Sequence, residues 1–253
     1  MRRCILIESV GILIPTRARH VPLLDSLLSL SKCDGAKELM DVVVLSDQDT
    51  ESFAIASEFS ERQNFRTYRA MISQERLLPV RAFVHLYNTC PSKYFCFMND
   101  ENIYEKDWLI RALDRFKREF PDDIGLLSLF KKKKAGLCLT TKDFVKYNEG
   151  EIYYPGYKLY YSDDELTMRA ILLGRYAWQE NSGVFHDNEI TVNVPTIPWE
   201  EKIRLKKIDR GLFYKRAEHN FGLPEDKIYK WTGFREINLP IRRESLVGRP
   251  NEG

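Results

Sequence analysis

Short apolar runs alternate with amphipathic segments through the first half of the chain. The runs have few polar residues, as strands covered by helices on both faces do, and they span residues 10–15, 41–45, 94–98 and 124–129. Between them, apolar residues recur at helical spacing, as in residues 21–28 and 108–120. This alternation predicts an α/β fold whose mostly parallel central sheet is flanked by helices.

The second half of the chain is less regular. Residues 153–161 are rich in tyrosine, include Pro155 and Gly156, and are expected to form a loop. Residues 163–173 have the pattern of a helix that stops at Gly174. From residue 195 onward the chain is basic and aromatic, which predicts a C-terminal helical extension.

Composition excludes several classes of protein. Hydrophobic residues make up 43% of the chain and charged residues 30%, which is typical of a globular protein with a solvated surface. The net charge of +2 gives no overall preference for an anionic partner. No apolar run approaches the roughly 18 residues of a membrane span. The five scattered cysteines lack C-x-x-C spacing, so we expect reduced thiols and a cytoplasmic location.

Polar residues gather where three of the predicted strands end. They are Thr16-Arg17, Ser46-Asp47 and Asn99-Asp100-Glu101. A solvated turn explains any one of these clusters. Ligands of parallel sheets bind at the carboxyl ends of the strands, so three clusters in one sheet favour a binding pocket there.

Asp100 and Glu101 point to a metal site. Adjacent carboxylates repel one another unless a positive charge compensates, and Mg²⁺ and Mn²⁺ prefer oxygen ligands. The alternative is an exposed acidic turn. His186 follows another apolar stretch and becomes a candidate ligand only if the fold brings it beside Asp100.

Asp163, Asp164 and Glu165 open the predicted helix at residues 163–173. The helix dipole alone favours acidic residues at this end. The functional alternative is a general base whose pKa is raised by the neighbouring carboxylate. Four lysines at residues 131–134 form either a solvated loop or a contact with phosphate groups.

Taken in order, these clusters resemble the family-2 glycosyltransferases of the GT-A type over about residues 9–190. The family's two nucleotide-contacting strands resemble residues 11–17 (GILIPTR) and 42–47 (VVVLSD). Its DxD region resembles residues 97–101 (FMNDE), followed by Trp108-Leu109. Its acceptor-side helix and late metal-binding histidine resemble residues 163–166 (DDEL) and 184–186 (VFH).

The resemblance implies that a hexosyl or pentosyl group moves from a nucleoside-diphosphate sugar to an acceptor hydroxyl, with inversion. It assigns nucleotide binding to Pro15, Thr16, Arg17, Asp47, Asn99 and Asp100. Charge and position add Arg81, or Arg69 in its place, as a phosphate contact. Mn²⁺ or Mg²⁺ would be bound by Asp100, Glu101 and His186. Asp163 is the expected base, with Asp164 in reserve.

The resemblance also implies how the chain is divided and what it binds. Residues 1–194 would form a GT-A (Rossmann-like) catalytic domain, with a nucleotide-sugar half to about residue 130 and an acceptor half over 131–194. Residues 195–253 would be a basic, aromatic helical extension packed on the same domain. The donor would carry uridine or guanosine diphosphate. The acceptor would be a glycan or a hydroxylated base in nucleic acid, since the lysine run and the basic extension suit a polyanion.

The chain departs from the family at two places. The turn at residues 46–50 reads SDQDT, which leaves the choice of nucleotide open. Asn99 stands where the family has aspartate, and this keeps open a degenerate, non-catalytic GT-A module that binds a glycan or nucleotide. A nucleotidyltransferase is the other alternative, although its phosphate loop normally contains glycine and residues 15–20 contain none.

Overall fold

The computed structural model describes residues 9–60, 64–130, 134–186 and 197–229. Its centre is a seven-stranded sheet in the order β3-β2-β1-β4-β7-β6-β8. Within the sheet only β7 runs antiparallel to its neighbours, so the sheet is mostly parallel as predicted. The predicted α/β class is therefore confirmed.

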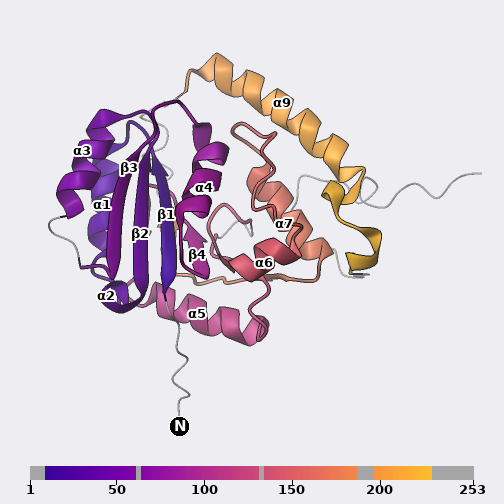
Figure 1. The fold of residues 1–253 in the computed structure, drawn as a ribbon, viewed down its shortest axis with the longest axis horizontal. Coiled ribbons are helices and arrows are strands. Elements are labelled where there is room, and N and C mark those ends of the chain that lie inside the picture. The colour runs from indigo at the N-terminus through magenta and orange to yellow at the C-terminus, as the bar shows by residue number, and fades with distance from the viewer. Residues whose placement is uncertain (1–8, 61–63, 131–133, 187–196, 230–253) are drawn as a thin grey trace, which may run out of the picture.

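The apolar runs predicted four strands of the sheet correctly. Three of them, β1 (Val10–Thr16), β2 (Met40–Ser46) and β4 (Tyr94–Phe97), lie side by side in Figure 1, and the fourth, β6 (Leu126–Ser128), lies beyond β4. The edge strand β3 (Thr67–Ile72) was not predicted, because its side chains are only partly covered and it lacks an apolar run. Beyond β4 lie β7 (Cys138–Thr141), β6 (Leu126–Ser128) and β8 (Tyr176–Trp178).

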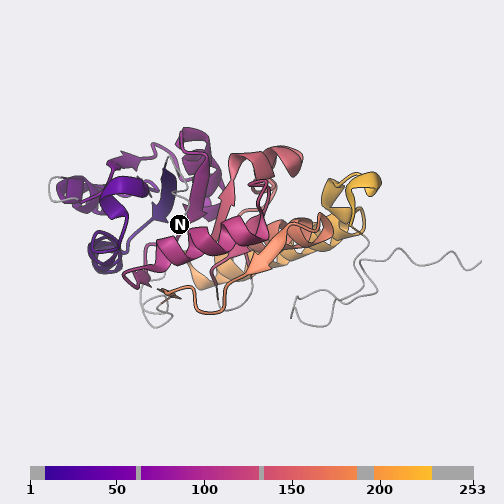
Figure 2. The same ribbon diagram turned by 90° about the horizontal axis from the view of Figure 1, so that it is seen from below.

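Helices cover both faces of the sheet. On one face, α1 (His20–Leu30), α3 (Thr50–Phe59) and α5 (Trp108–Glu119) pack on alternate strand residues such as Ile12 and Val42. On the other face, α4 (Leu78–Thr89) packs on Leu13 and Val43. The views in Figures 1 and 2 show α5 lying crosswise to the strands.

The buried face of α1 differs from the predicted one. Within residues 21–28, Val21, Leu24 and Leu28 are exposed, and only Leu27 of the predicted set is buried. Leu23 and Leu30 complete the core-facing side. The apolar spacing predicted the helix correctly, but a stretch with so many leucines contains two possible faces.

The second half adds the elements that carry the later motifs. The short helix α6 (Lys142–Tyr147) follows β7, as the short helix α2 (Ala36–Leu39) precedes β2 in the first half. Helix α7 (Ser162–Leu172) is the helix predicted at residues 163–173, and Gly174 follows it with a left-handed φ of 65°. A small antiparallel pair, β5 (Asn102–Tyr104) and β9 (Val184–His186), joins segments about 80 residues apart and aligns Asn102 with His186.

The C-terminal part that the structure describes is helical. Helix α9 (Trp199–Ala217) runs obliquely past α7 along the outer edge of the molecule in Figure 1, and 3₁₀ turns follow at Asn220–Gly222 and Glu225–Lys227. Phe213 of α9 is buried in the same core cluster as Leu166 and Ala170 of α7. Residues 230–253 of the predicted extension lie outside the described residues. No helix in the described part of the chain has the length and apolar character of a membrane span.

Candidate active site

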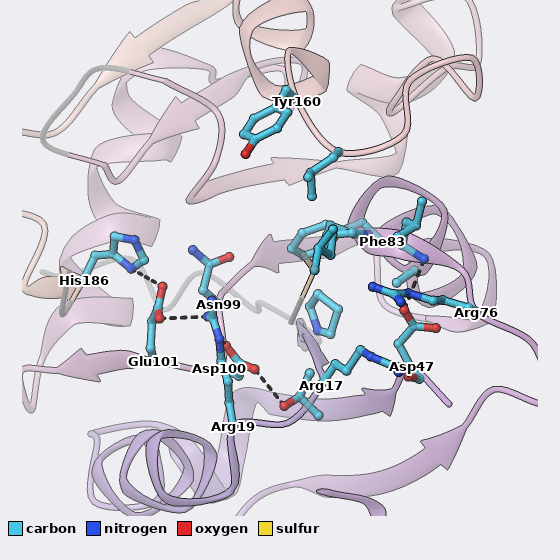
Figure 3. Close-up of a pocket in the computed structure, with 17 residues that line it drawn as sticks. Arg17, Arg19, Asp47, Arg76, Phe83, Asn99, Asp100, Glu101, Tyr160 and His186 are labelled. Atoms are coloured by element: carbon cyan, nitrogen blue, oxygen red, sulfur yellow. Dashed lines mark hydrogen bonds and ion pairs between the residues drawn. The ribbon is translucent and has the colours of Figure 1, made fainter. Parts of the chain in front are cut away.

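The three polar strand ends meet in one cavity of about 380 Å³, the strand-end pocket. It is lined by the ends of β1, β2 and β4, the start of α4, the loop before α7, and His186 (Figure 3). All of the predicted nucleotide- and metal-binding residues except Arg81 line it: Pro15, Thr16, Arg17, Asp47, Asn99, Asp100, Glu101 and His186. The residues at the strand ends lie together because parallel strands end at the same edge, and His186 joins them from β9 of the small second sheet.

Arg81 and Arg69 lie elsewhere. Arg81 is half exposed on α4 and pairs with Glu75 at 3.5 Å. Arg69 donates to the backbone carbonyl of Thr89 at 2.9 Å. The arginines that line the pocket with Arg17 are instead Arg19 and Arg76. Sequence reasoning missed both, because loop arginines are common and nothing local marks which of them turn inward.

Arg19 supplies the positive charge that the acidic pair requires. Asp100 and Glu101 are only 4% and 2% exposed. One guanidinium nitrogen of Arg19, Nη1, lies 2.9 Å from Asp100 Oδ1 and 2.8 Å from Glu101 Oε2. Thr16 donates to Asp100 Oδ2 at 2.7 Å. Burial raises the pKa of Asp100, and the contacts with Arg19 and Thr16 oppose that rise.

Asp47 holds one wall of the pocket through hydrogen bonds to the segment that begins α4. Its carboxylate accepts the backbone N–H groups of Leu77 at 2.7 Å and Leu78 at 3.1 Å, which fixes the start of α4. Leu78 has a left-handed φ of 63°, an unfavourable conformation for a leucine. Arg17 donates to the backbone carbonyl of Asp47. This side of the pocket is therefore held rigidly by charge-assisted hydrogen bonds.

Glu101 and His186 form a pair suited to a divalent cation. The β5–β9 pairing places Nδ1 of His186 3.1 Å from Oε1 of Glu101. Adjacent ligands of an octahedral ion with bonds of about 2.1 Å are separated by about 3 Å, so the two atoms fit as neighbours around one ion. Both oxygens of Asp100 already accept hydrogen bonds from Thr16 and Arg19.

The protein offers such an ion few further ligands. Within the described ranges, no three His, Cys, Asp or Glu side chains converge in a way that could hold a metal. Mg²⁺ is commonly bound by one or two carboxylates together with water and the phosphates of a substrate. The Glu101–His186 pair therefore fits an ion that arrives with a phosphate ligand.

A second cavity, the Asp163 pocket, adjoins the first. Its volume is about 590 Å³, and it shares Phe83, Asn99, Tyr160 and His186 with the strand-end pocket. Its own lining includes Lys134, Gly136, Tyr153, Asp163, Asp164 and Lys206. The shared wall means that a ligand reaching past Asn99 would extend from one cavity into the other.

The two aspartates of the Asp163 pocket are in different environments. Asp164 is buried and forms an ion pair with Nζ of Lys134. Burial, and then the charge of Asp164, raise the pKa of Asp163 to about 6. A Cβ atom at Gly136 would lie 3.3 Å from Oδ2 of Asp163, so glycine leaves room for this carboxylate. Asp163 therefore has the pKa of a group that exchanges protons near neutral pH.

The lysine run at residues 131–134 can be placed only in part. Lys134 is largely covered and is paired with Asp164, not part of a solvated loop. The other three lysines lie outside the described residues.

The loop that roofs both pockets is held by a residue from α9. The buried carboxylate of Asp209 accepts the consecutive backbone N–H groups of Lys158, Leu159 and Tyr160 at 2.9–3.3 Å. Leu159 and Tyr160 line both cavities. Sequence reasoning missed Asp209. The available signal was its position midway between Leu205 and Phe213, which places an acid on the buried face of the helix.

Comparison with known proteins supports the fold independently of these contacts. No protein-family model and no curated protein matches the sequence. The structure is similar to that of TarS from S. aureus, with a TM-score of 0.58 and 15% identity, over 82% of this chain and 43% of that one. It is also similar to TarS 1–349 in complex with UDP-GlcNAc, with a TM-score of 0.58 and 17% identity, over 84% and 65% of the chains.

A third similar structure is the mannosyltransferase PcManGT from Pyrobaculum calidifontis, in complex with GDP-Man and Mn²⁺. The TM-score is 0.61 at 13% identity, over 84% of this chain and 63% of that one. The chain therefore has the GT-A fold of nucleotide-diphospho-sugar transferases, as predicted. It spans less than two thirds of the length of each of these three chains.

Proposed function

We propose that the protein is a glycosyltransferase that moves a sugar from a nucleoside-diphosphate sugar to an acceptor hydroxyl, with a divalent cation as cofactor. One observation carries the proposal. A cavity lined by Asp100, Glu101, His186 and three arginines shares a wall with a second cavity that contains Asp163. Two similar structures support it, since TarS 1–349 holds UDP-GlcNAc and PcManGT holds GDP-Man with Mn²⁺.

The donor would occupy the strand-end pocket. Pro15, Thr16 and Asp47 would bound the nucleoside, while Arg17 and Arg76 offer positive charge to the diphosphate. Glu101 and His186 would hold Mn²⁺ or Mg²⁺, which would act as a Lewis acid that stabilises the departing diphosphate. Arg19 and Thr16 keep Asp100 and Glu101 in place beneath this site. Asn99, in the wall shared by both cavities, would contact the donor near its sugar.

Asp163 would act as the general base. Its carboxylate would accept the proton of an acceptor hydroxyl as the oxygen attacks the anomeric carbon. Attack on the face opposite the leaving diphosphate inverts the configuration at that carbon. Asp163 is favoured over Asp164 because the ion pair with Lys134 holds Asp164. The pKa of Asp163, raised to about 6 by burial, makes it a stronger base than an ordinary carboxylate while leaving it mostly ionised at pH 7.

The acceptor would be a glycan or a hydroxylated base of nucleic acid. It would enter the Asp163 pocket, whose partly exposed tyrosines Tyr160 and Tyr161 offer flat surfaces that suit a sugar ring or a base. Lys206 contributes a positive charge at the same pocket.

Thermal unfolding in the presence of candidate donors tests the proposal. A ligand at 100 times its Kd adds about 2.7 kcal/mol of stability, which shifts the melting temperature measurably. UDP, GDP and their sugar conjugates would be compared with and without Mn²⁺. We expect one nucleotide to stabilise the protein only when Mn²⁺ is present.

Paired variants make this experiment specific. Glu101→Ala should abolish the metal-dependent stabilisation, while Glu75→Ala, which removes an exposed carboxylate outside both pockets, should retain it. No stabilisation by any nucleotide would contradict donor binding. Stabilisation without turnover would favour the non-catalytic module.

A further inference from the structure

The outer side of α9 exposes large apolar side chains. Trp199 is 74% exposed, Ile203 53% and Tyr214 37%, while Ile208, about 140° around the helix from Ile203, is 48% exposed. Surface helices normally keep such residues on the core side and polar residues outside. Helix α5 follows that rule, since its only large exposed apolar residue is Ile110. Helix α1 also exposes apolar residues, so exposure alone does not distinguish α9 among the described helices; the charges around its apolar residues do.

Basic side chains are interleaved with these apolar ones. The exposed cations of the helix are Arg204, Lys206, Lys207, Arg210 and Lys215. Trp199, Ile203, Lys207, Arg210 and Tyr214 follow one another at spacings of three or four residues and so form one line along the helix, the outer stripe. The acidic residues of the helix are confined to its first turn and to the buried Asp209.

We propose that the outer stripe binds an anionic lipid surface, with α9 lying in the plane of the interface. Trp199 and Ile203 would enter the boundary between headgroups and acyl chains, and Tyr214 would sit at headgroup level. Lys207, Arg210 and their neighbours would attract anionic headgroups, at roughly tenfold in affinity for every one to two cations. The stripe thus has both elements that interfacial helices need: apolar area and positive charge.

A lipid surface accounts for this face better than a nucleic acid does. Single-stranded nucleic acids bind through cations and through aromatic rings that stack on bases. Trp199 and Tyr214 could serve that purpose, but exposed isoleucines cannot stack and would remain in water. Insertion into lipid removes Ile203 from water, so a lipid surface accounts for the exposed isoleucine and a polyanion does not.

The stripe lies beside the candidate active site. Lys206, next to Lys207, lines the Asp163 pocket and is 5.9 Å from the ring centre of Tyr160. Ile197, just before α9, lines the strand-end pocket. A helix docked on a membrane would bring the Asp163 pocket close to the lipid. If the proposed transferase function is correct, its acceptor is then attached to that membrane.

Vesicle co-sedimentation of the full chain tests lipid binding without any substrate. Vesicles of phosphatidylcholine alone would be compared with vesicles that also contain phosphatidylglycerol. We expect binding to the anionic vesicles only, weakening as salt is added. Trp199→Ser combined with Ile203→Ser should lower the affinity at least tenfold, and Lys207→Glu combined with Arg210→Glu should do the same.

Matched controls use equally exposed residues far from α9. Val21→Ser on α1 and Lys37→Glu on α2 should leave vesicle binding unchanged. All of these side chains are exposed, so circular dichroism and thermal unfolding should show that each variant is folded. Equal binding by the α9 variants and the wild type would overturn the proposal, as would no binding to anionic vesicles. Tighter binding to single-stranded DNA, lost in the same variants, would also overturn it. Failure of donor binding would leave the vesicle result unaffected.

Discussion

The two pockets lie side by side but are built in different ways. The strand-end pocket takes its form from the sheet, and its carboxylates are held by Arg19 and Thr16, on or next to a strand that lines it. One wall of the Asp163 pocket comes from the loop before α7, and another comes from the first turn of α7, which carries the proposed general base Asp163. Asp209 of α9 holds the loop, and Arg216 of α9 donates to Glu165 Oε1 of α7 at 2.7 Å, in each case across about 50 residues. Donor binding should therefore depend on contacts among the strand ends and the loops that follow them, and acceptor chemistry on helix α9.

Replacing Asp163 should distinguish the roles of the two pockets most strongly. Asp163→Asn removes the proposed base and should lower the rate of sugar transfer by about 10²–10⁴-fold. Stabilisation by the nucleotide should persist, because Asp163 does not line the strand-end pocket. Product formation and thermal unfolding would be measured on the same preparation. Asp143→Asn, in the corresponding first turn of α6, is the matched control. Undiminished transfer by Asp163→Asn would remove this residue from the mechanism.

Asp209 should matter for the second pocket and for stability. Asp209→Asn keeps the shape of the side chain but replaces one of the oxygens that accept three backbone N–H groups, and it removes the charge. We expect a loss of about 1–3 kcal/mol in the free energy of unfolding. The KM for the acceptor should rise more than that for the donor.

Hydrogen exchange would show this effect directly. The amides of residues 158–160 should exchange faster in Asp209→Asn than in Glu218→Gln, a control at the end of the same helix. Unchanged protection of these amides would mean that the loop does not depend on α9.

The pH dependence of transfer should reflect Asp163. A base acts when deprotonated, so the rate should rise with pH up to about 6 and then level off. The charge of Asp164 contributes to the raised pKa of Asp163, so Asp164→Asn should move this rise to lower pH. If the pH dependence of the rate is the same in Asp164→Asn as in the wild type, the titrating group is not Asp163.

The smallest expected effect is on stability. The pKa of Asp163 in the folded protein, about 6, is above the ordinary value of about 3.9. The folded state therefore holds this proton more tightly, and its stability falls as pH rises from about 4 to 6. Asp163→Asn avoids this loss and should be more stable than the wild type at pH 7 by roughly 1 kcal/mol, after allowance for solvent screening. Urea unfolding should show the difference at pH 7 and not at pH 4.

The strength of the local apolar pattern explains which strands could be predicted from the sequence. The buried strands β1, β2 and β4 are continuous apolar runs, so both the strands and the polar residues at their ends could be identified. The edge strand β3 and the antiparallel β7 have weaker patterns, and the pairing of β7 with β4 and β6 depends on distant residues.

Side chains that act across long separations were harder to identify. Arg19 acts on Asp100 and Glu101 from about 80 residues away, and Asp209 on the 158–160 loop from about 50. Neither contact has a local pattern. Asp209 nevertheless had one local signal, because it is a charged residue at a position that the helical spacing predicts to be buried.

Release of nucleoside diphosphate from the stabilising nucleotide sugar tests the central claim most directly. The wild-type protein should release it slowly without an acceptor, because water can take the place of the acceptor hydroxyl. Release should require Mn²⁺ or Mg²⁺ and should be lost in Glu101→Ala. If no nucleotide sugar is cleaved, or if pyrophosphate is released from a nucleoside triphosphate and a sugar phosphate instead, the protein is not the glycosyltransferase proposed here.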